Sequence, residues 1–168
     1  MEKQITIIGG GLAGCEAAFL LARSGRAVRL VDMKPDRLSP AHNSPLLGEL
    51  VCSNSLRAEG PTAAVGLLKA EMAMLGSAVM EAALATRVPA GKALAVNREK
   101  FAAHLSQAVQ AHPLIVREST LVEAPPAEGP AIIATGPLTE GPLADGIAAL
   151  AGAGHLHFYD AIAPIVAS

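Results

Sequence analysis

The sequence has almost no aromatic side chains: they make up 2% of its 168 residues, and tryptophan is absent. Because 51% of the chain is hydrophobic, the core must be built from aliphatic side chains. Charged residues amount to 17%, and together with the apolar content this excludes an intrinsically disordered chain. The length is sufficient for one ordinary domain with a hydrophobic core.

Other scarce features narrow the class of protein further. Cys15 and Cys52 are the only cysteines, too few for a disulfide framework. No apolar run reaches the roughly 18 residues of a transmembrane helix, and the first apolar run is too short for a signal peptide. The net charge of −2 gives the whole chain no electrostatic footprint for nucleic acid, although a local basic patch is compatible with it. A cytoplasmic protein without a membrane partner is the expectation.

The first 32 residues predict a β-α-β unit. Residues 4–9 (QITIIG) form a β-branched run that ends in glycine, which is typical of a buried strand. Residues 11–25 predict a helix that Gly25 terminates, and residues 27–32 predict a second strand. Since such units are right-handed with parallel strands, the sequence predicts an α/β, Rossmann-like fold with helices packed on a parallel sheet.

The rest of the chain alternates between helical and extended patterns. Residues 33–48 contain three prolines and predict a loop. Helices are predicted over 62–84, with a break near Gly76, and over 98–112, where Asn97 is the expected N-cap. Strands are predicted at 92–96, 114–118, 120–124 and 130–136, the last of them buried, and an extended segment at 156–168.

The first turn, IIGGGLAG, has the spacing Gly9-x-Gly11-x-x-Gly14 in the strand–turn–helix context of a dinucleotide-binding fingerprint. Gly9 permits the tight turn, Gly11 lets a pyrophosphate approach the backbone, and Gly14 lets the helix pack closely on the strand. The helix N-terminus adds free N–H groups for phosphate. A glycine-rich turn without a ligand is the alternative. The candidate cofactor-binding residues of this loop are Gly9, Gly10, Gly11, Leu12, Ala13 and Gly14.

Two further segments extend the predicted cofactor site. Asp32 closes the second strand, where its carboxylate can hold ribose hydroxyls and would repel a 2′-phosphate. The site therefore favours FAD or NAD over NADP. The run PAIIATGP resembles the second cofactor segment of flavoproteins that bind two dinucleotides, which makes Thr135 and Gly136 candidates as well. A plain strand followed by a Gly-Pro turn is the alternative.

Longer strings of the sequence resemble one family. ELVCSNSLRAEG, AVGLLKAEM, RVPAGKALAVNREKF, IIATGPLT and FYDAIAPIV follow GGGLAGCEAA in this order. Together they resemble the folate- and FAD-dependent tRNA uracil-5-methyltransferases, the TrmFO family, from Ile5 to Val166. The more distant GidA/MnmG tRNA-modifying flavoproteins share only the first string. The alternatives are another FAD or NAD oxidoreductase, a GidA/MnmG-like enzyme included, and an inactive truncated nucleotide-binding fragment.

The resemblance implies a chemistry and roles for several residues. Methylenetetrahydrofolate supplies a one-carbon unit, reduced flavin recharged by NAD(P)H supplies electrons, and 5-methyluridine forms in the T-loop of tRNA. Uracil C5 becomes nucleophilic after a thiolate adds to C6, so the chemistry favours a cysteine partner. The resemblance places the cysteine usually credited as the nucleophile in a later segment of the family members, and it makes Cys52 a candidate catalytic thiol near the flavin. The alternative is a buried cysteine at a loop-to-helix junction that Asn54 or Ser55 caps. Asn54 could otherwise contact flavin or pterin, and Arg57 a phosphate or a folate carboxylate.

Members of that family are much longer than this chain. We therefore expect residues 1–168 to be the N-terminal part of a Rossmann-like FAD-binding domain, incomplete at its C-terminus and without a second domain. Such a piece would carry the ADP end of the FAD site and little of the tRNA surface. Cys15 is expected to pack in the core. His42 is either a catalytic acid or base or a loop histidine satisfied by backbone, and Ala63 stands where the family has asparagine.

Overall fold

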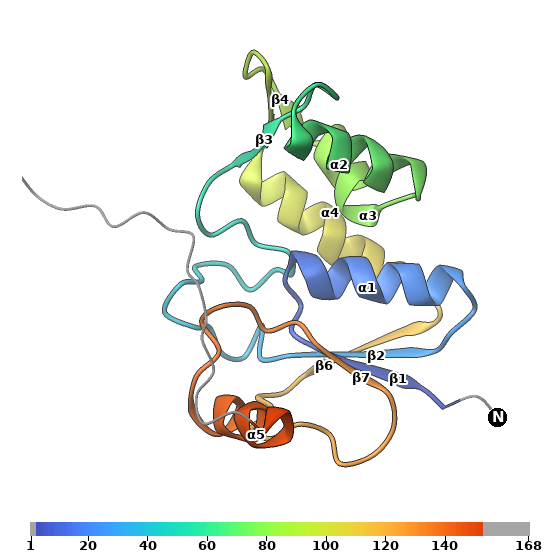
Figure 1. Ribbon diagram of the computed structural model, residues 1–168, viewed down its shortest axis with the longest axis vertical. Coiled ribbons are helices and arrows are strands. Elements are labelled where there is room, and N and C mark those ends of the chain that lie inside the picture. Colours follow the sequence, from blue (N-terminus) through green and yellow to red (C-terminus); the bar gives the residue numbers. More distant parts are fainter. Residues whose placement is uncertain (1–2, 153–168) are drawn as a thin grey trace, which may run out of the picture.

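The protein folds around a parallel sheet, as seen in a computed structural model that describes residues 3–152 (Figure 1). The strand order is β6-β2-β1-β7, and every neighbouring pair is parallel. This arrangement confirms the predicted Rossmann-like α/β class. The four strands are β1 (Ile5–Ile8), β2 (Val28–Asp32), β6 (Ile115–Ser119) and β7 (Ala131–Ile133).

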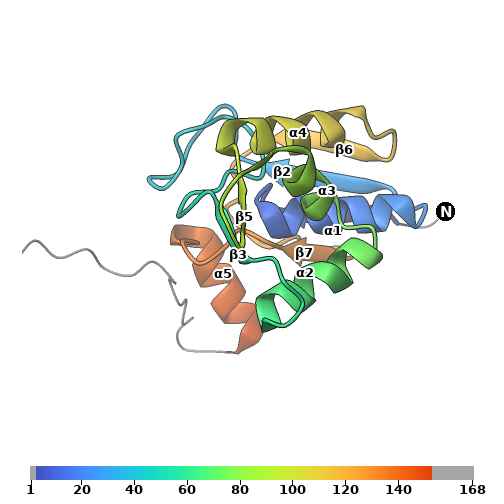
Figure 2. The same cartoon turned by 90° about the horizontal axis from the view of Figure 1, so that it is seen from above.

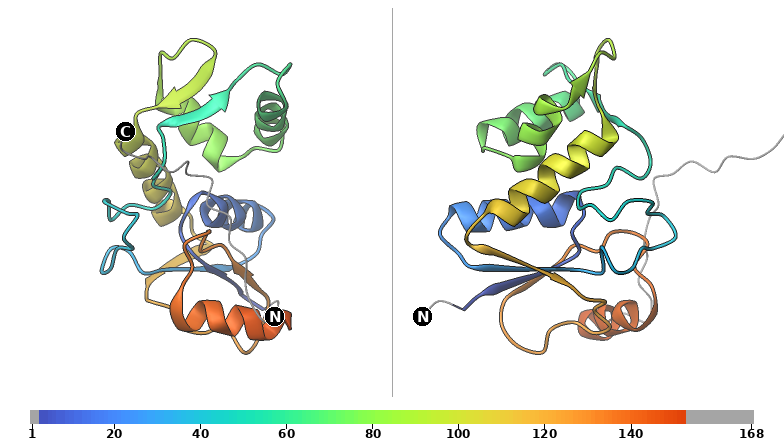
Figure 3. Two further views of the ribbon diagram at one scale, coloured as in Figure 1. Left: turned by 60° about the vertical axis from the view of Figure 1, so that its left-hand side comes forward. Right: turned by 180° about the vertical axis from the view of Figure 1, so that it is seen from behind.

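Helix α1 (Leu12–Arg23) joins β1 to β2 and covers one face of the sheet. Figures 1 and 3 show α5 (Gly141–Ala151) on the opposite side of the sheet. The core between the sheet and α1 is aliphatic, as the composition predicts, because Ile7, Ala18 and Leu30 are fully buried there. Burial of such side chains contributes roughly 25 cal/mol per Å² of apolar surface and is the main stabilising term.

A smaller antiparallel sheet is inserted between β2 and β6, with the strand order β3-β5-β4. Figure 2 shows α4 running beside β6, so this second unit packs on the first and shares its core. The predicted break near Gly76 is confirmed, since one helix ends before it and another begins after it. The inserted elements are β3 (Ser55–Ala58), α2 (Ala64–Met74), α3 (Ala78–Ala85), β4 (Arg87–Val88), β5 (Ala93–Val96) and α4 (Arg98–Ala111).

Several sequence predictions are wrong. Residues 120–124 form no strand: the Thr120 N–H donates to the Asp32 carbonyl at 2.9 Å, and the chain then leaves the sheet. The segment 130–136 does contain β7, but β7 has only β1 as a neighbour and its residues are exposed in the described structure. Strands β3 and β4 and helix α5 were not expected. Residues 156–168, predicted to be extended, lie outside the described part.

The helices of residues 3–152 are all too short or too polar to span a bilayer.

Helix α2 begins without a side-chain cap, which suggests a stabilising substitution. The backbone of Ala63 is extended at this N-cap position, yet no side chain accepts from the first turn. In contrast, Asn97 Oδ1 accepts from the Lys100 N–H at 3.0 Å at the start of α4, as predicted. We expect Ala63→Asn to raise the free energy of unfolding by about 1 kcal/mol, measured by urea titration. Thr62→Asn places the same amide one residue outside the cap and should add nothing. An unchanged midpoint for Ala63→Asn would contradict the cap.

Candidate functional site

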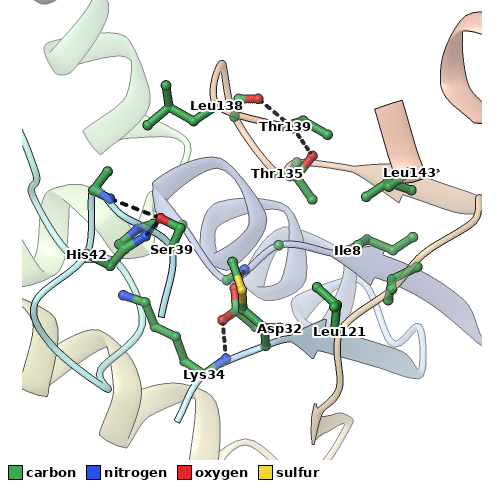
Figure 4. A pocket seen from close by; sticks show the side chains of 18 of the residues that line it. Ile8, Asp32, Lys34, Ser39, His42, Leu121, Thr135, Leu138, Thr139 and Leu143 are labelled. Atoms are coloured by element: carbon green, nitrogen blue, oxygen red, sulfur yellow. Dashed lines mark hydrogen bonds between the residues drawn. The ribbon is translucent and has the colours of Figure 1, made fainter. Parts of the chain in front are cut away.

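A cavity of about 600 Å³ lies at the carboxyl ends of β1 and β2. Ligands of open α/β sheets bind at this end of the strands, and the volume is typical of small-molecule sites. Figure 4 shows Thr135 and Thr139 on one side of the cavity and Ser39 and His42 on the other, with Asp32 between them. The walls are the glycine loop, residues 37–42 after β2, residues 120–123 after β6 and residues 134–143 after β7.

At two positions of the loop, Gly9 and Gly14, the fold requires a glycine even without a ligand. Gly9 has φ +102°, which disfavours other residues, and a Cβ there would lie 2.5 Å from the Ala134 carbonyl oxygen. A Cβ at Gly14 would overlap the carbonyl oxygen of Gly9, because α1 crosses so close to the end of β1. Gly9 lines the cavity, whereas Gly14 lies behind it as a packing position. These two positions fit the roles predicted from the sequence.

Gly11 is different, because neither backbone conformation nor packing requires a glycine there. Its φ of −72° and ψ of −168° are open to any residue, and a Cβ would meet no atom within 4 Å. The first helical bond runs from the Cys15 N–H to the Gly11 carbonyl, so the N–H groups before Cys15 precede the helical ladder. Open space above unpaired helix N–H groups fits an anionic group such as a pyrophosphate.

Asp32 links β2 to the glycine loop and faces the cavity. Its Oδ2 accepts from the Gly10 N–H at 2.5 Å, and its Oδ1 accepts from the Lys34 N–H at 2.8 Å. Each carboxylate oxygen retains a second lone pair for another donor. A hydroxyl of a ribose bound beside the loop would be such a donor.

Behind Asp32, a buried ion pair holds the loop between β2 and β3. Lys34 Nζ lies 2.8 Å from Glu49 Oε2, and the two side chains are only 5% and 8% exposed. Lys34 also donates to the Leu46 carbonyl, and Glu49 accepts from the N–H groups of Asn43 and Ser44. Burial acts to raise the pKa of Glu49, but the hydrogen bonds from Lys34 and the two backbone groups hold this pKa below its ordinary value. No local pattern in the sequence indicates a pair 15 residues apart.

His42 faces the same cavity from this loop. Its Nδ1 lies 2.6 Å from Ser39 Oγ, so the described structure pairs the ring with a hydroxyl and not with the backbone. Burial, and next the nearby Lys34 charge, lower the pKa of His42. The imidazole is therefore neutral at neutral pH, and a role as acid or base stays a prediction.

The two cysteines differ in environment. Cys52 is exposed and lines the cavity, so the alternative of a buried thiol is wrong. Cys15 is fully buried in α1, and its Sγ lies 3.4 Å from the Gly10 carbonyl oxygen. Burial first, and then the charge of Asp32, raise the pKa of the Cys15 thiol to about 12, which confirms that it is an inert packing residue.

The remaining candidates divide between two places. Thr135 and Gly136 line the cavity, as predicted for cofactor-binding residues. Asn54 and Arg57 do not line it: they lie just before and within β3, in the second sheet. Asn54 Nδ2 donates to the Val96 carbonyl at 3.4 Å, and because β3 follows, the alternative of a helix cap is wrong.

Three curated relatives carry the name methylenetetrahydrofolate–tRNA-(uracil-5-)-methyltransferase TrmFO. The protein of Oleidesulfovibrio alaskensis is 58% identical over 167 residues, which cover 96% of this chain and 37% of that protein. The Anaeromyxobacter sp. protein is 58% identical over a match that covers 99% of this chain and 37% of that protein. The Moorella thermoacetica protein is 54% identical over a match that covers 99% of this chain and 38% of that protein. The chain thus spans little more than a third of these relatives. The matches confirm the resemblance that the sequence strings indicate.

Similarity also extends to a solved structure and to a family description. The structure of Aquifex aeolicus GidA in its form II crystal matches with a TM-score of 0.59 and 17% identity, over 76% of this chain and 21% of that chain. At this identity the likeness shows a shared fold. The family described as glucose inhibited division protein A matches residues 4–168. The chain therefore belongs to the glucose inhibited division protein A family.

Proposed function

We propose that this chain is the FAD-binding part of a tRNA uracil-5-methyltransferase that depends on methylenetetrahydrofolate and forms 5-methyluridine in the T-loop of tRNA. The observation that carries the proposal is the open space at Gly11 above the N-terminus of α1, beside the carboxylate of Asp32. The reaction is supported by 58% identity to relatives with that name. A GidA-like enzyme is the weaker alternative, because its solved structure shares 17% identity.

The cavity residues fit particular parts of FAD. We assign the pyrophosphate to the glycine loop and the N–H groups of Leu12 and Ala13, and a ribose to Asp32. Thr135 and Gly136 border the cofactor on the side of β7. When bound, FAD supplies the electrons for reduction of the one-carbon unit, with NAD(P)H as the source. A tRNA substrate also supports the expected cytoplasmic location.

Roles outside the ADP site follow from exposure. Cys52 is the exposed cavity thiol, so we assign to it a catalytic role as a thiol beside the flavin. Asn54 lies two residues beyond Cys52 and outside the cavity lining; its amide oxygen is available to a flavin or pterin edge that extends past the cavity, because only its Nδ2 bonds to β5. Arg57 is exposed and suits a phosphate or a folate carboxylate.

Asp32 offers a direct test of cofactor binding. We expect Asp32→Ala to weaken FAD binding by about 10- to 100-fold, because both the ribose acceptor and the anchor of the Gly10 N–H are lost. Asp36→Ala is the matched control, since Asp36 bonds to Ser119 Oγ and does not line the cavity. The measurement is a flavin fluorescence titration of the full-length protein. Equal affinities in the two variants would remove Asp32 from the site.

The activity is tested with full-length protein, methylenetetrahydrofolate, NAD(P)H and an unmodified tRNA transcript. We expect 5-methyluridine in the nucleosides recovered, detected by mass spectrometry, and its loss in Cys52→Ser with flavin content retained. Flavin binding without 5-methyluridine in the wild type would favour another flavoprotein activity. Unchanged methylation in Cys52→Ser would exclude Cys52 from the mechanism.

A further inference from the structure

We propose that exposed cations on the second sheet form a docking surface for the phosphate backbone of the RNA substrate. We call this surface the basic ribbon; it consists of Arg57, Lys92, Arg98 and Lys100. The inference rests on the proposed function, because RNA is the partner that the function supplies. The net charge of the whole chain does not predict such a surface. The fold contributes by placing Arg57 beside residues 92–100, which carry the other three cations.

The antiparallel ladder of β3 and β5 has Arg57 and Lys92 at one end and Arg98 and Lys100 beyond the other. Ala58 pairs with Ala93, and the Glu59 N–H donates to the Lys92 carbonyl at 3.0 Å, so the end of β3 that carries Arg57 lies beside Lys92. At the other end of the ladder, the Val96 N–H donates to the Asn54 carbonyl at 2.9 Å. The first turn of α4, with its two cations, begins directly after β5. The four cations are therefore spread over the two ends of the β3–β5 ladder.

These cations are available to a ligand. All four side chains are exposed, and within residues 3–152 none of them makes an ion pair or side-chain hydrogen bond. Cations elsewhere are neutralised, for example Arg29 by Glu118 and Lys34 by Glu49. Arg87 of β4 neutralises Glu59, the acidic residue next to the ribbon, at 2.6 Å. Glu99, in the first turn of α4, and Glu71 of α2 are exposed carboxylates without a partner among the described residues.

A charged side chain beneath β3 adds to the potential. Lys69 of α2 is 8% exposed, and its Nζ donates to the carbonyl oxygens of Leu56 and Val65, both at 2.7 Å. Neither bond involves a carboxylate. Burial, and next the charge of Arg57, lower the pKa of Lys69, while the charge of Glu59 acts in the opposite direction. A phosphate above β3 would meet the exposed cations and, at longer range, this buried one.

Arg57 has a backbone that suits glycine better than arginine. Its φ is +65°, in the left-handed region, and no other non-glycine residue of the described chain has a positive φ. Such a conformation is unfavourable for a residue with a Cβ, and its persistence points to a function of the side chain. Since the guanidinium makes no bond within the described protein, its charge is the property that remains to explain an arginine here.

The ribbon is continuous with the cavity. Cys52 lines the cavity, and the exposed residues 51–54 lead from it directly into β3. Figures 1 and 3 show this segment rising from the side of the parallel sheet to the second sheet. Five residues from Cys52 to Arg57 span at most about 17 Å, a few nucleotides of RNA. A strand held on the ribbon could therefore present one base to the cavity.

The test is the salt dependence of RNA binding by the full-length protein, with an unmodified tRNA transcript as the probe. The variant combines Arg57→Gln, Lys92→Gln, Arg98→Gln and Lys100→Gln. We expect affinity at low salt to fall by at least about 10-fold, and the slope of log K against log salt to fall by about one for each phosphate that is no longer neutralised. Lys92→Gln alone is compared with Lys3→Gln, which removes the same charge before β1 and should change nothing.

Arg57→Gly separates the charge from the backbone strain. Glycine adopts the observed φ without strain, so this variant should unfold at the same or a higher temperature and still bind tRNA more weakly. Flavin content should stay unchanged in Lys92→Gln and Lys3→Gln, which alter no candidate cofactor residue. Wild-type slope and affinity in the fourfold variant, with methylation intact, would overturn the ribbon and leave the proposed function standing. A loss of tRNA affinity in Lys3→Gln equal to that in Lys92→Gln would also overturn the basic ribbon. Absence of both tRNA binding and methylation in the wild-type protein would overturn the proposed function itself.

Discussion

Gly14→Ala is expected to destabilise the fold by about 3 kcal/mol or more and to abolish FAD binding. The added Cβ would overlap the Gly9 carbonyl oxygen, and it would also lie 3.6 Å from the Cβ of Ala134. The overlapping atom belongs to the backbone that leads β1 into α1, so relief requires moving a helix relative to a sheet. Overpacking that shifts backbone typically costs about 1–3 kcal/mol and occasionally more, and an overlap between two backbone segments belongs at the upper end of that range. The measurements are urea unfolding and flavin titration.

Gly11→Ala is the matched control, because it adds the same methyl group three residues earlier in open space. We expect its free energy of unfolding to stay within about 1 kcal/mol of wild type, the usual effect of alanine at an N-cap. FAD affinity should nevertheless fall by at least about 10-fold, since the methyl group takes the space assigned to the pyrophosphate. A stable Gly14→Ala protein would contradict the packing role. Undiminished FAD binding in Gly11→Ala would contradict the site.

The part of the fold that the sequence predicted is local. From β1 to β2, each element packs on the next one in the chain, and the glycine spacing fixes both turn and helix entry. The spacing of the apolar residues, together with Gly25 and Asp32, was therefore sufficient to predict the β-α-β unit. The same holds for α4, whose N-cap and terminating His112 are read from neighbouring residues.

The second sheet was missed because nothing local specifies it. Strand β4 has two residues, and β3 contains a register shift and the left-handed Arg57, so neither shows a strand period. Their pairing with β5 joins residues far apart in the sequence and depends on tertiary contacts, which local sequence patterns do not indicate. The burial of β7 was misjudged for a related reason: its apolar run predicts a strand, but only the strand order reveals an edge position.

The residues of the site likewise divide into those predicted from local sequence and those that only the tertiary structure brings together. The glycine loop, Asp32 and Thr135 were predicted because fixed spacing after a strand places them at the carboxyl edge of the sheet. The pairs Lys34–Glu49 and Ser39–His42 were not, because a loop of irregular backbone brings them together. Residues 120–123 were predicted to be a strand because of their apolar run, so their place in the cavity wall was not predicted.

Glu49→Gln is expected to lower the free energy of unfolding by about 3 kcal/mol at neutral pH. Glutamine keeps one oxygen, which can accept from Asn43 in place of Oε1, whereas its amide nitrogen replaces Oε2, the acceptor for Lys34 and Ser44. Lys34 would remain 5% exposed without its counter-ion, and breaking a buried pair from one side costs about 3–5 kcal/mol. Glu118→Gln is the control: its pair with Arg29 is about 40% exposed and should contribute less than about 1 kcal/mol.

The pH dependence of this difference follows from the lowered pKa of Glu49. A carboxylate with a depressed folded pKa stabilises the protein fully above its unfolded pKa, near about 4.3, and loses this contribution as pH falls through the folded pKa. The gap between wild type and Glu49→Gln should thus be constant near neutrality and shrink below about pH 4.5. Replacing both partners, as Lys34→Met with Glu49→Leu, should recover most of the stability, because two buried charges are then absent. A gap that is independent of pH, or no recovery in the double variant, would mean that Glu49 acts through the shape of its side chain and not through its charge.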